Sequence, residues 1–128
     1  MNKVYDTFFD TSFDNFKKGD KMEKDKEQIY ISGPMSNIEN YNFEEFMKAE
    51  DKFEGKYIVI NPAKISKALC KSFGKSLNEI PKETYMKEDI RLLLNCDIIY
   101  MLEDWEKSEG AILEHEIAKQ IGLKIIYK

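Results

Sequence analysis

The residue types best suited to chemistry lie in Ser108–Glu114, where a hydroxyl, a glycine and a carboxylate follow the apolar run Asp97–Leu102. The segment opens a predicted helix, and in open α/β sheets ligands bind where strands end. Glu114 lies one helical turn from Ala111 and from Ala118, so small neighbours leave room beside it for a ligand. A carboxylate in this position can act as a nucleophile or a general base.

The start of the same helix offers donors for an anion. Ser108 lies at or near the N-cap, and capping is the default role of an isolated serine there. The alternative is that Ser108, Gly110 and the first free amides bind a negatively charged ligand, with help from the helix dipole.

A second acid, Asp89, lies on an apolar stripe. In the helix predicted over Glu83–Asn95 it shares a face with Tyr85 and Leu93. Desolvation among apolar neighbours would raise the pKa of Asp89 and suit it to donating a proton. Equally, Asp89 can be a boundary acid whose oxygens are satisfied by a nearby amide. Tyr85 is a candidate substrate-binding residue.

Two further candidates belong to the first predicted strand, Gln28–Gly33, and its loop. Tyr30 is either a core tyrosine or a side chain whose hydroxyl orients a carboxylate in the site. Gly33 permits close backbone approach, and Ser36 and Asn37 offer donors to a phosphate or sugar, although such loops are often only turns. The spacing matches neither a P-loop nor the dinucleotide fingerprint.

Trp105, the only tryptophan, follows the apolar run Asp97–Leu102 in an acidic loop. Its ring can stack on a base at the ligand edge, or it can pack back on the domain as a lid.

Strands alternating with helices position these residues. The pattern predicts an α/β fold, a Rossmann-like or flavodoxin-like three-layer sandwich with a mostly parallel sheet of about four to five strands. The predicted strands are 28–33, 56–60, 97–102 and 124–127, and the predicted helices start near 40–42, 83 and 110. Residues 64–80 are polar and are expected to form a loop with a short helix. The last helix is expected to bury Leu113 and Ile121.

The chain divides into a polar and aromatic extension, residues 1–26, and a domain over 27–128. Tyr5, Phe9, Phe13 and Phe16 recur at roughly helical spacing in the extension, so it is either an amphipathic helix or a loose segment.

Composition narrows the function classes. Charged residues make up 34% of the chain and its net charge is −4, without the basic surplus that a nucleic-acid polymer would require. Neither a membrane span nor a signal peptide is expected. Cys70, Cys96 and His115 have no metal-ligand spacing, so we expect neither metal nor organic cofactor. Reduced cysteines fit a cytoplasmic setting.

Together these segments resemble the nucleoside 2-deoxyribosyltransferase-like superfamily, in particular a largely uncharacterised branch common in bacteria and phages. The matching segments are Tyr30–Met35, Asn61–Ala63, Tyr85–Asp89, Cys96–Asp97 and Trp105–Ala111, followed by Glu114 and Ala118. The resemblance implies that Glu114 attacks the anomeric carbon of a nucleoside or nucleotide and displaces the base. It also implies that Asp89 handles the proton of the departing base and that Tyr30 orients Glu114.

Ser108 distinguishes between branches of that superfamily. Transferases for free nucleosides usually have an aspartate six residues before the glutamate, where this chain has Ser108. The related deoxyribonucleoside 5′-monophosphate N-glycosidases have a serine there that contacts the substrate phosphate. They also have an arginine in the first loop, which here contains Met35, Ser36 and Asn37 instead.

The resemblance therefore implies cleavage of the N-glycosidic bond of a nucleotide, by hydrolysis or base transfer. It also implies a homodimer or larger homo-oligomer. The alternatives are a non-catalytic nucleotide-binding module that senses a signal in a phage or bacterial pathway, and a dimerising scaffold.

Overall fold

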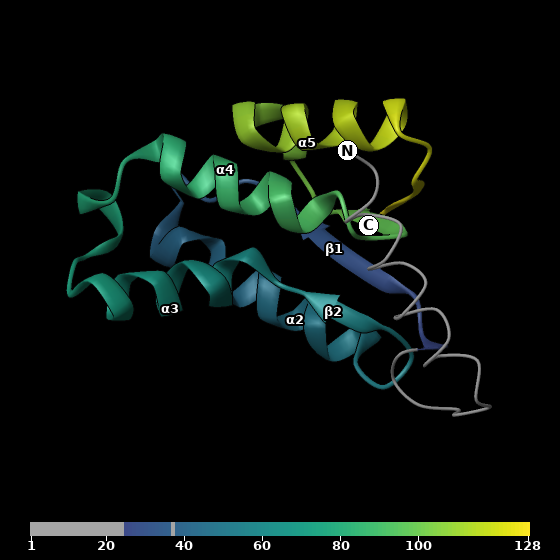
Figure 1. Ribbon diagram of the computed structural model, residues 1–128, viewed down its shortest axis with the longest axis horizontal. Helices are drawn as coiled ribbons and strands as arrows, with labels where there is room; N and C mark the ends of the chain where they lie inside the picture. Colours follow the sequence, from purple (N-terminus) through teal and green to yellow (C-terminus); the bar gives the residue numbers. More distant parts are fainter. Residues whose placement is uncertain (1–24, 37) are drawn as a thin grey trace, which may run out of the picture.

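The computed structural model describes residues 25–36 and 38–128. Their strands form one parallel sheet in the order β2-β1-β3-β4 (Figure 1). The strands are β1 (Gln28–Ser32), β2 (Ile58–Ile60), β3 (Ile98–Met101) and β4 (Lys124–Tyr127). The predicted α/β fold with a Rossmann-like or flavodoxin-like sheet is confirmed.

Helices connect the strands and cover both faces of the sheet. The α-helices are α2 (Phe43–Phe53), α3 (Pro62–Phe73), α4 (Lys82–Leu93) and α5 (Glu109–Gln120). The short 3-10 helices are η2 (Glu39–Asn42), η3 (Leu77–Glu79) and η4 (Trp105–Lys107). Figure 1 shows α4 and α5 next to each other on one face of the sheet and α2 on the other. With helices on both faces, the two central strands are buried along their whole length except at Gln28, which is half-buried.

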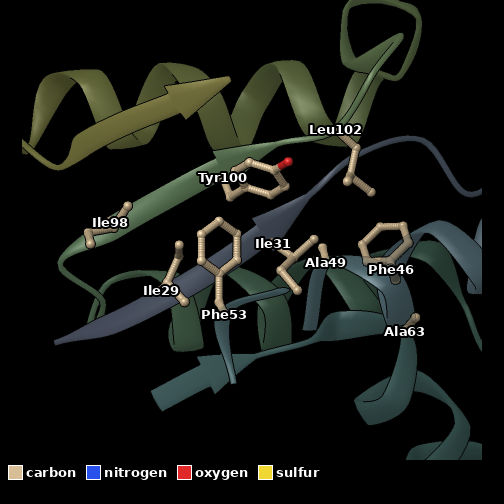
Figure 2. Close-up of a cluster of buried hydrophobic side chains, with 9 residues drawn as sticks. All are labelled: Ile29, Ile31, Phe46, Ala49, Phe53, Ala63, Ile98, Tyr100 and Leu102. Atoms are coloured by element: carbon tan, nitrogen blue, oxygen red, sulfur yellow. The ribbon is translucent and has the colours of Figure 1, made fainter. Parts of the chain in front are cut away.

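Alternation along β1 divides the core between these faces. Ile29 and Ile31 pack with Phe46 and Phe53 of α2 in the cluster of Figure 2. Tyr30 points to the opposite face, where Ala111 and Ala118 of α5 belong to a second cluster. A strand places successive side chains on opposite faces, so Tyr30 and Ser32 both lie under α5.

The expectation of a loop with a short helix over residues 64–80 is wrong, because α3 runs for 12 residues from Pro62 to Phe73. Asn61 caps its start by accepting a hydrogen bond from the Ala63 amide, and Gly74 ends it at φ 66°. A proline in the first turn and a left-handed glycine after the last turn are strong helix boundaries. The polar residues on the outer face of α3 favoured the prediction of a loop despite these boundary signals. Helices α3 and α4 extend together beyond the carboxyl edge of the sheet (Figure 1).

The predicted burial on α5 is only partly right. Ala111 and Ala118 are buried, whereas Leu113 and Ile121 are 43% and 47% exposed. The small residues and Glu114 face the sheet and Ile117 packs beside them, whereas Ile112 and Leu113 point outward.

Gly33 lies where β1 leaves the sheet, and its neighbours leave no space for a side chain. A Cβ atom built there would lie 2.7 Å from the Cβ of Leu102. The Leu102 amide also donates a hydrogen bond to the Ser32 carbonyl, at 2.8 Å. Gly33 is therefore required by the close packing of the segments that follow β1 and β3.

The aromatic residues Tyr5, Phe9, Phe13 and Phe16 lie outside the described residues. Within the part that the structure describes, no helix combines the length and apolar character needed to cross a membrane.

Candidate active site

A cavity of about 380 Å³ opens at the carboxyl edge of the sheet. Its walls come from β1 and the following loop, from η2, α3 and η3, and from α4 and α5. This is the edge at which open α/β sheets bind ligands, and the volume lies within the range of small-molecule sites. The α3–α4 extension therefore adds a wall that the four-stranded sheet alone would lack.

The buried carboxylate of Glu114 lines this cavity. Glu114 is 6% exposed on the inner face of α5. Its Oε1 accepts a hydrogen bond from Ser32 Oγ at 2.6 Å, and its Oε2 accepts one from the Tyr30 hydroxyl at 2.8 Å. Both donors come from the same face of β1, so strand and helix together fix the carboxylate.

Burial and hydrogen bonding act in opposite directions on Glu114. Burial raises the pKa of Glu114 to about 7, while the hydrogen bonds from Ser32 and Tyr30 lower it. Burial, followed by the charge of Glu114, raises the pKa of Tyr30 well above its usual value, so the phenol remains a donor. The glutamate is thus close to half ionised at neutral pH.

Asp89 lies in the same cavity on α4. Burial raises the pKa of Asp89 to about 8, and the negative charges of Glu114 and then Glu88 add to this shift. Asp89 therefore retains its proton at a pH where Glu114 begins to lose its own. Two acids with separated pKa values can divide the roles of nucleophile and proton donor.

Most of the other predicted site residues line this cavity: Gly33, Ser36, Tyr85, Ser108 and Gly110. Asn37 lies outside the described residues. The Tyr85 hydroxyl donates to the Leu77 carbonyl at 2.5 Å, which leaves its ring as a wall.

Ser108 and Gly110 lie at the start of α5, and both also form part of the cavity wall. Ser108 Oγ accepts a hydrogen bond from the Ala111 amide at 3.2 Å, so it is the helix N-cap while also facing the cavity. A Cβ atom at Gly110 would lie 3.5 Å from Met86 Sδ, an ordinary contact distance. Gly110 therefore keeps space open beside Ser108.

Trp105 is not brought to the cavity. Its ring stacks on His115 with centroids 4.2 Å apart, and His115 Nε2 lies 2.7 Å from the Tyr127 hydroxyl. The tryptophan packs back on α5 and β4, as in the lid alternative, and not at a base-binding position.

Several side chains of the cavity region were not singled out from the sequence, among them Ser32, Lys82 and Tyr41. Ser32 shares the inward face of β1 with Tyr30, and the period of two along the strand was the signal that could have found it. Lys82 is the one cation among the described residues lining the cavity, and it pairs with Glu109 at 2.9 Å. Tyr41 reaches the wall from a left-handed turn, at φ 54°, that no local motif predicts.

Within residues 25–36 and 38–128, no three or more His, Cys, Asp or Glu side chains gather as metal ligands would. The chemistry available in the cavity is that of two carboxyl groups, hydroxyl donors and one ammonium group.

The fold and the cavity together define an α/β protein with a paired-carboxyl pocket at the carboxyl edge of a parallel sheet. The chain belongs to the family described as a domain of unknown function (DUF4406), whose model matches residues 27–127. No curated protein and no solved structure is significantly similar to it.

Proposed function

We propose that this protein cleaves the N-glycosidic bond of a nucleoside 5′-monophosphate, by hydrolysis or by transfer to a second base. The observation that carries the proposal is the buried Glu114 carboxylate, held by Ser32 and Tyr30 in one cavity with the raised-pKa acid Asp89. The resemblance to nucleoside 2-deoxyribosyltransferase-like proteins supports the same roles.

In this mechanism, the two acids account for the bonds and protons exchanged in a double displacement. A Glu114 oxygen forms an ester bond with the anomeric carbon while the bond from that carbon to the base nitrogen breaks. The proton of Asp89 passes to the departing base. Water, or a second base, then attacks the anomeric carbon, loses its proton to Asp89 and releases Glu114 as a carboxylate.

Charge in the cavity favours a monophosphate over a free nucleoside. Lys82 and the Ser108 hydroxyl lie on the wall that includes the start of α5, and both can donate to a phosphate. The monophosphate glycosidases have an arginine in the first loop. The first loop of this chain has Met35 instead and contributes no cation. We assign that charge to Lys82.

The test is chromatographic detection of free base. Wild-type protein and its Glu114→Ala variant are incubated with the common ribo- and deoxyribonucleoside 5′-monophosphates and the matching nucleosides, with and without a second base. Base release from monophosphates by the wild type alone is expected. Release by Glu114→Ala at a comparable rate would refute the mechanism, and release from nucleosides only would refute the phosphate preference.

One observation favours a second candidate, nucleotide binding without turnover. Both oxygens of Glu114 already accept hydrogen bonds, at 2.6 and 2.8 Å, which reduces their nucleophilicity. Tight binding of a monophosphate with no base release, even with an acceptor base present, would identify the protein as a binding module.

A further inference from the structure

A buried hydroxyl faces the cavity from α3. Ser66 is 4% exposed and lines the cavity one helical turn after Pro62. Within the described ranges, its Oγ has no hydrogen-bond partner. Every fully enclosed side-chain nitrogen or oxygen there does have a partner, so the Ser66 Oγ is not fully enclosed. The Oγ atom is therefore accessible through the cavity, and it can donate to or accept from a ligand.

Contacts of α4 give the cavity two distinct ends. On one side, Lys82 reaches Glu109, and Met86 approaches Gly110, so this end belongs to the start of α5. On the other side, the Tyr85 hydroxyl contacts the Leu77 carbonyl and lies 3.6 Å from Cys70 Sγ. This second end belongs to α3 and η3, and Ser66 faces it.

The α3 end suits a flat, largely apolar ring with a polar edge. Tyr41, Phe46 and Ile80 contribute aromatic and aliphatic walls. Asn78 also lines the cavity, and its Oδ1 accepts a hydrogen bond from Ser76 Oγ at 3.1 Å. With that oxygen engaged, the N–H groups are the part of this exposed amide left free to donate to a ligand.

We propose that the α3 end of the cavity binds the nucleobase, and that Ser66 and Asn78 select a base whose edge carries a carbonyl oxygen. This inference rests on the proposed function, because it assumes that the ligand is a nucleotide. An amide N–H donates to a 6-oxopurine or 4-oxopyrimidine carbonyl, whereas an amino group at that position would meet another donor.

Carbon-linked monophosphates test the inference, because they bind without being cleaved. The probes are 9-deazainosine and 9-deazaadenosine 5′-monophosphate, which differ in the exocyclic oxo or amino group, and the base-free 2-deoxyribose 5-phosphate. Isothermal titration calorimetry gives each dissociation constant for wild type, Ser66→Ala, Asn78→Asp and the control Ser72→Ala. Ser72 is an exposed serine on the same helix.

Wild type is expected to bind the oxo probe more tightly than the amino probe. Ser66→Ala should weaken binding of the oxo probe by roughly three- to tenfold, the range of one neutral hydrogen bond, with sugar phosphate binding unchanged. Asn78→Asp should reverse the oxo-over-amino preference, and Ser72→Ala should change nothing.

Three results would overturn the inference. Unchanged probe binding by Ser66→Ala excludes that hydroxyl, and equal losses for probe and sugar phosphate exclude the base assignment. An oxo-over-amino preference that persists in Asn78→Asp excludes carbonyl selection. If wild type still releases base in these cases, the proposed function stands. Wild type that neither binds a probe nor releases base refutes both.

Discussion

Replacing Ser32 by alanine tests whether β1 controls the ionisation of Glu114. Ser32 is fully buried, and its hydroxyl donates to Glu114 Oε1 at 2.6 Å. A hydrogen bond to a charged group contributes about 2 kcal/mol, and 1.36 kcal/mol corresponds to one pKa unit, so its loss should raise the pKa of Glu114 by about 1.5.

In the proposed mechanism, the reactive form has Glu114 ionised and Asp89 protonated. With pKa values of about 7 for Glu114 and about 8 for Asp89, the wild type should show a narrow bell-shaped profile of kcat/KM between these values. A Glu114 pKa near ~8.5 would cut the active fraction roughly fifteenfold at pH 7 but only about fivefold at the optimum. The optimum itself should move to higher pH.

The assay is base release from a monophosphate, measured as kcat/KM at closely spaced pH values for wild type, Ser32→Ala and the control Ser72→Ala. Circular dichroism establishes that each variant is folded. The reasoning fails if Ser32→Ala is folded and loses activity equally at every pH, or if its ascending limb moves to lower pH.

Three more predictions follow from the same geometry. Lys82→Met should raise KM for monophosphates about three- to tenfold, with little change in KM for nucleosides. The control Lys87→Met, at an exposed position on the same helix, should leave both KM values unchanged. Equal losses for both substrates in Lys82→Met would contradict this. Gly33→Ala should destabilise the fold by about 1–3 kcal/mol, because its Cβ would lie 2.7 Å from Leu102, whereas Gly110→Ala should be tolerated; denaturant unfolding compares them. Asp89→Asn should raise the Tm more at pH 9 than at pH 5. The raised pKa of Asp89 gives stability that is full below its ordinary pKa of 3.8 and is lost progressively as pH rises to about 8; an equal change at both pH values would contradict this.

Local patterns in the sequence predicted the sheet and most of its helices. Strand β4 was predicted as Lys124–Tyr127, the bounds it has, because a short apolar run after a glycine has few alternatives. A short helix was expected within residues 64–80, but the start and length of α3 were not predicted, because its polar outer face outweighed its boundary signals, Asn61, Pro62 and Gly74. Local composition describes one segment at a time, whereas the burial of Ala63 and Ser66 depends on what packs against α3.

The candidate site was predictable where its chemistry lies in single residues. Glu114, Asp89 and Tyr30 were named from their positions on helix and strand, and all three line the cavity. Lys82 and Ser66 were not, because one is a lysine at a helix start and the other a serine in a polar segment. Their significance arises only when α3 and α4 close around one space. Trp105 is the opposite case: it was a candidate site residue, but its ring packs on His115.

The distribution of charge along the cavity wall would orient a nucleotide bound as proposed. Asp89 and Glu114 both line the cavity, and a phosphate beside an ionised Glu114 would be repelled. Lys82 is held at the α5 end by Glu109, and this exposed pair is weak enough for a doubly charged phosphate to replace the carboxylate. The apolar α3 end offers no compensating cation among the described lining residues. In the proposed complex, a monophosphate would therefore place its phosphate at the α5 end and its base at the α3 end. Asp89, whose pKa burial raises to about 8, would then be the acid available to protonate the departing base.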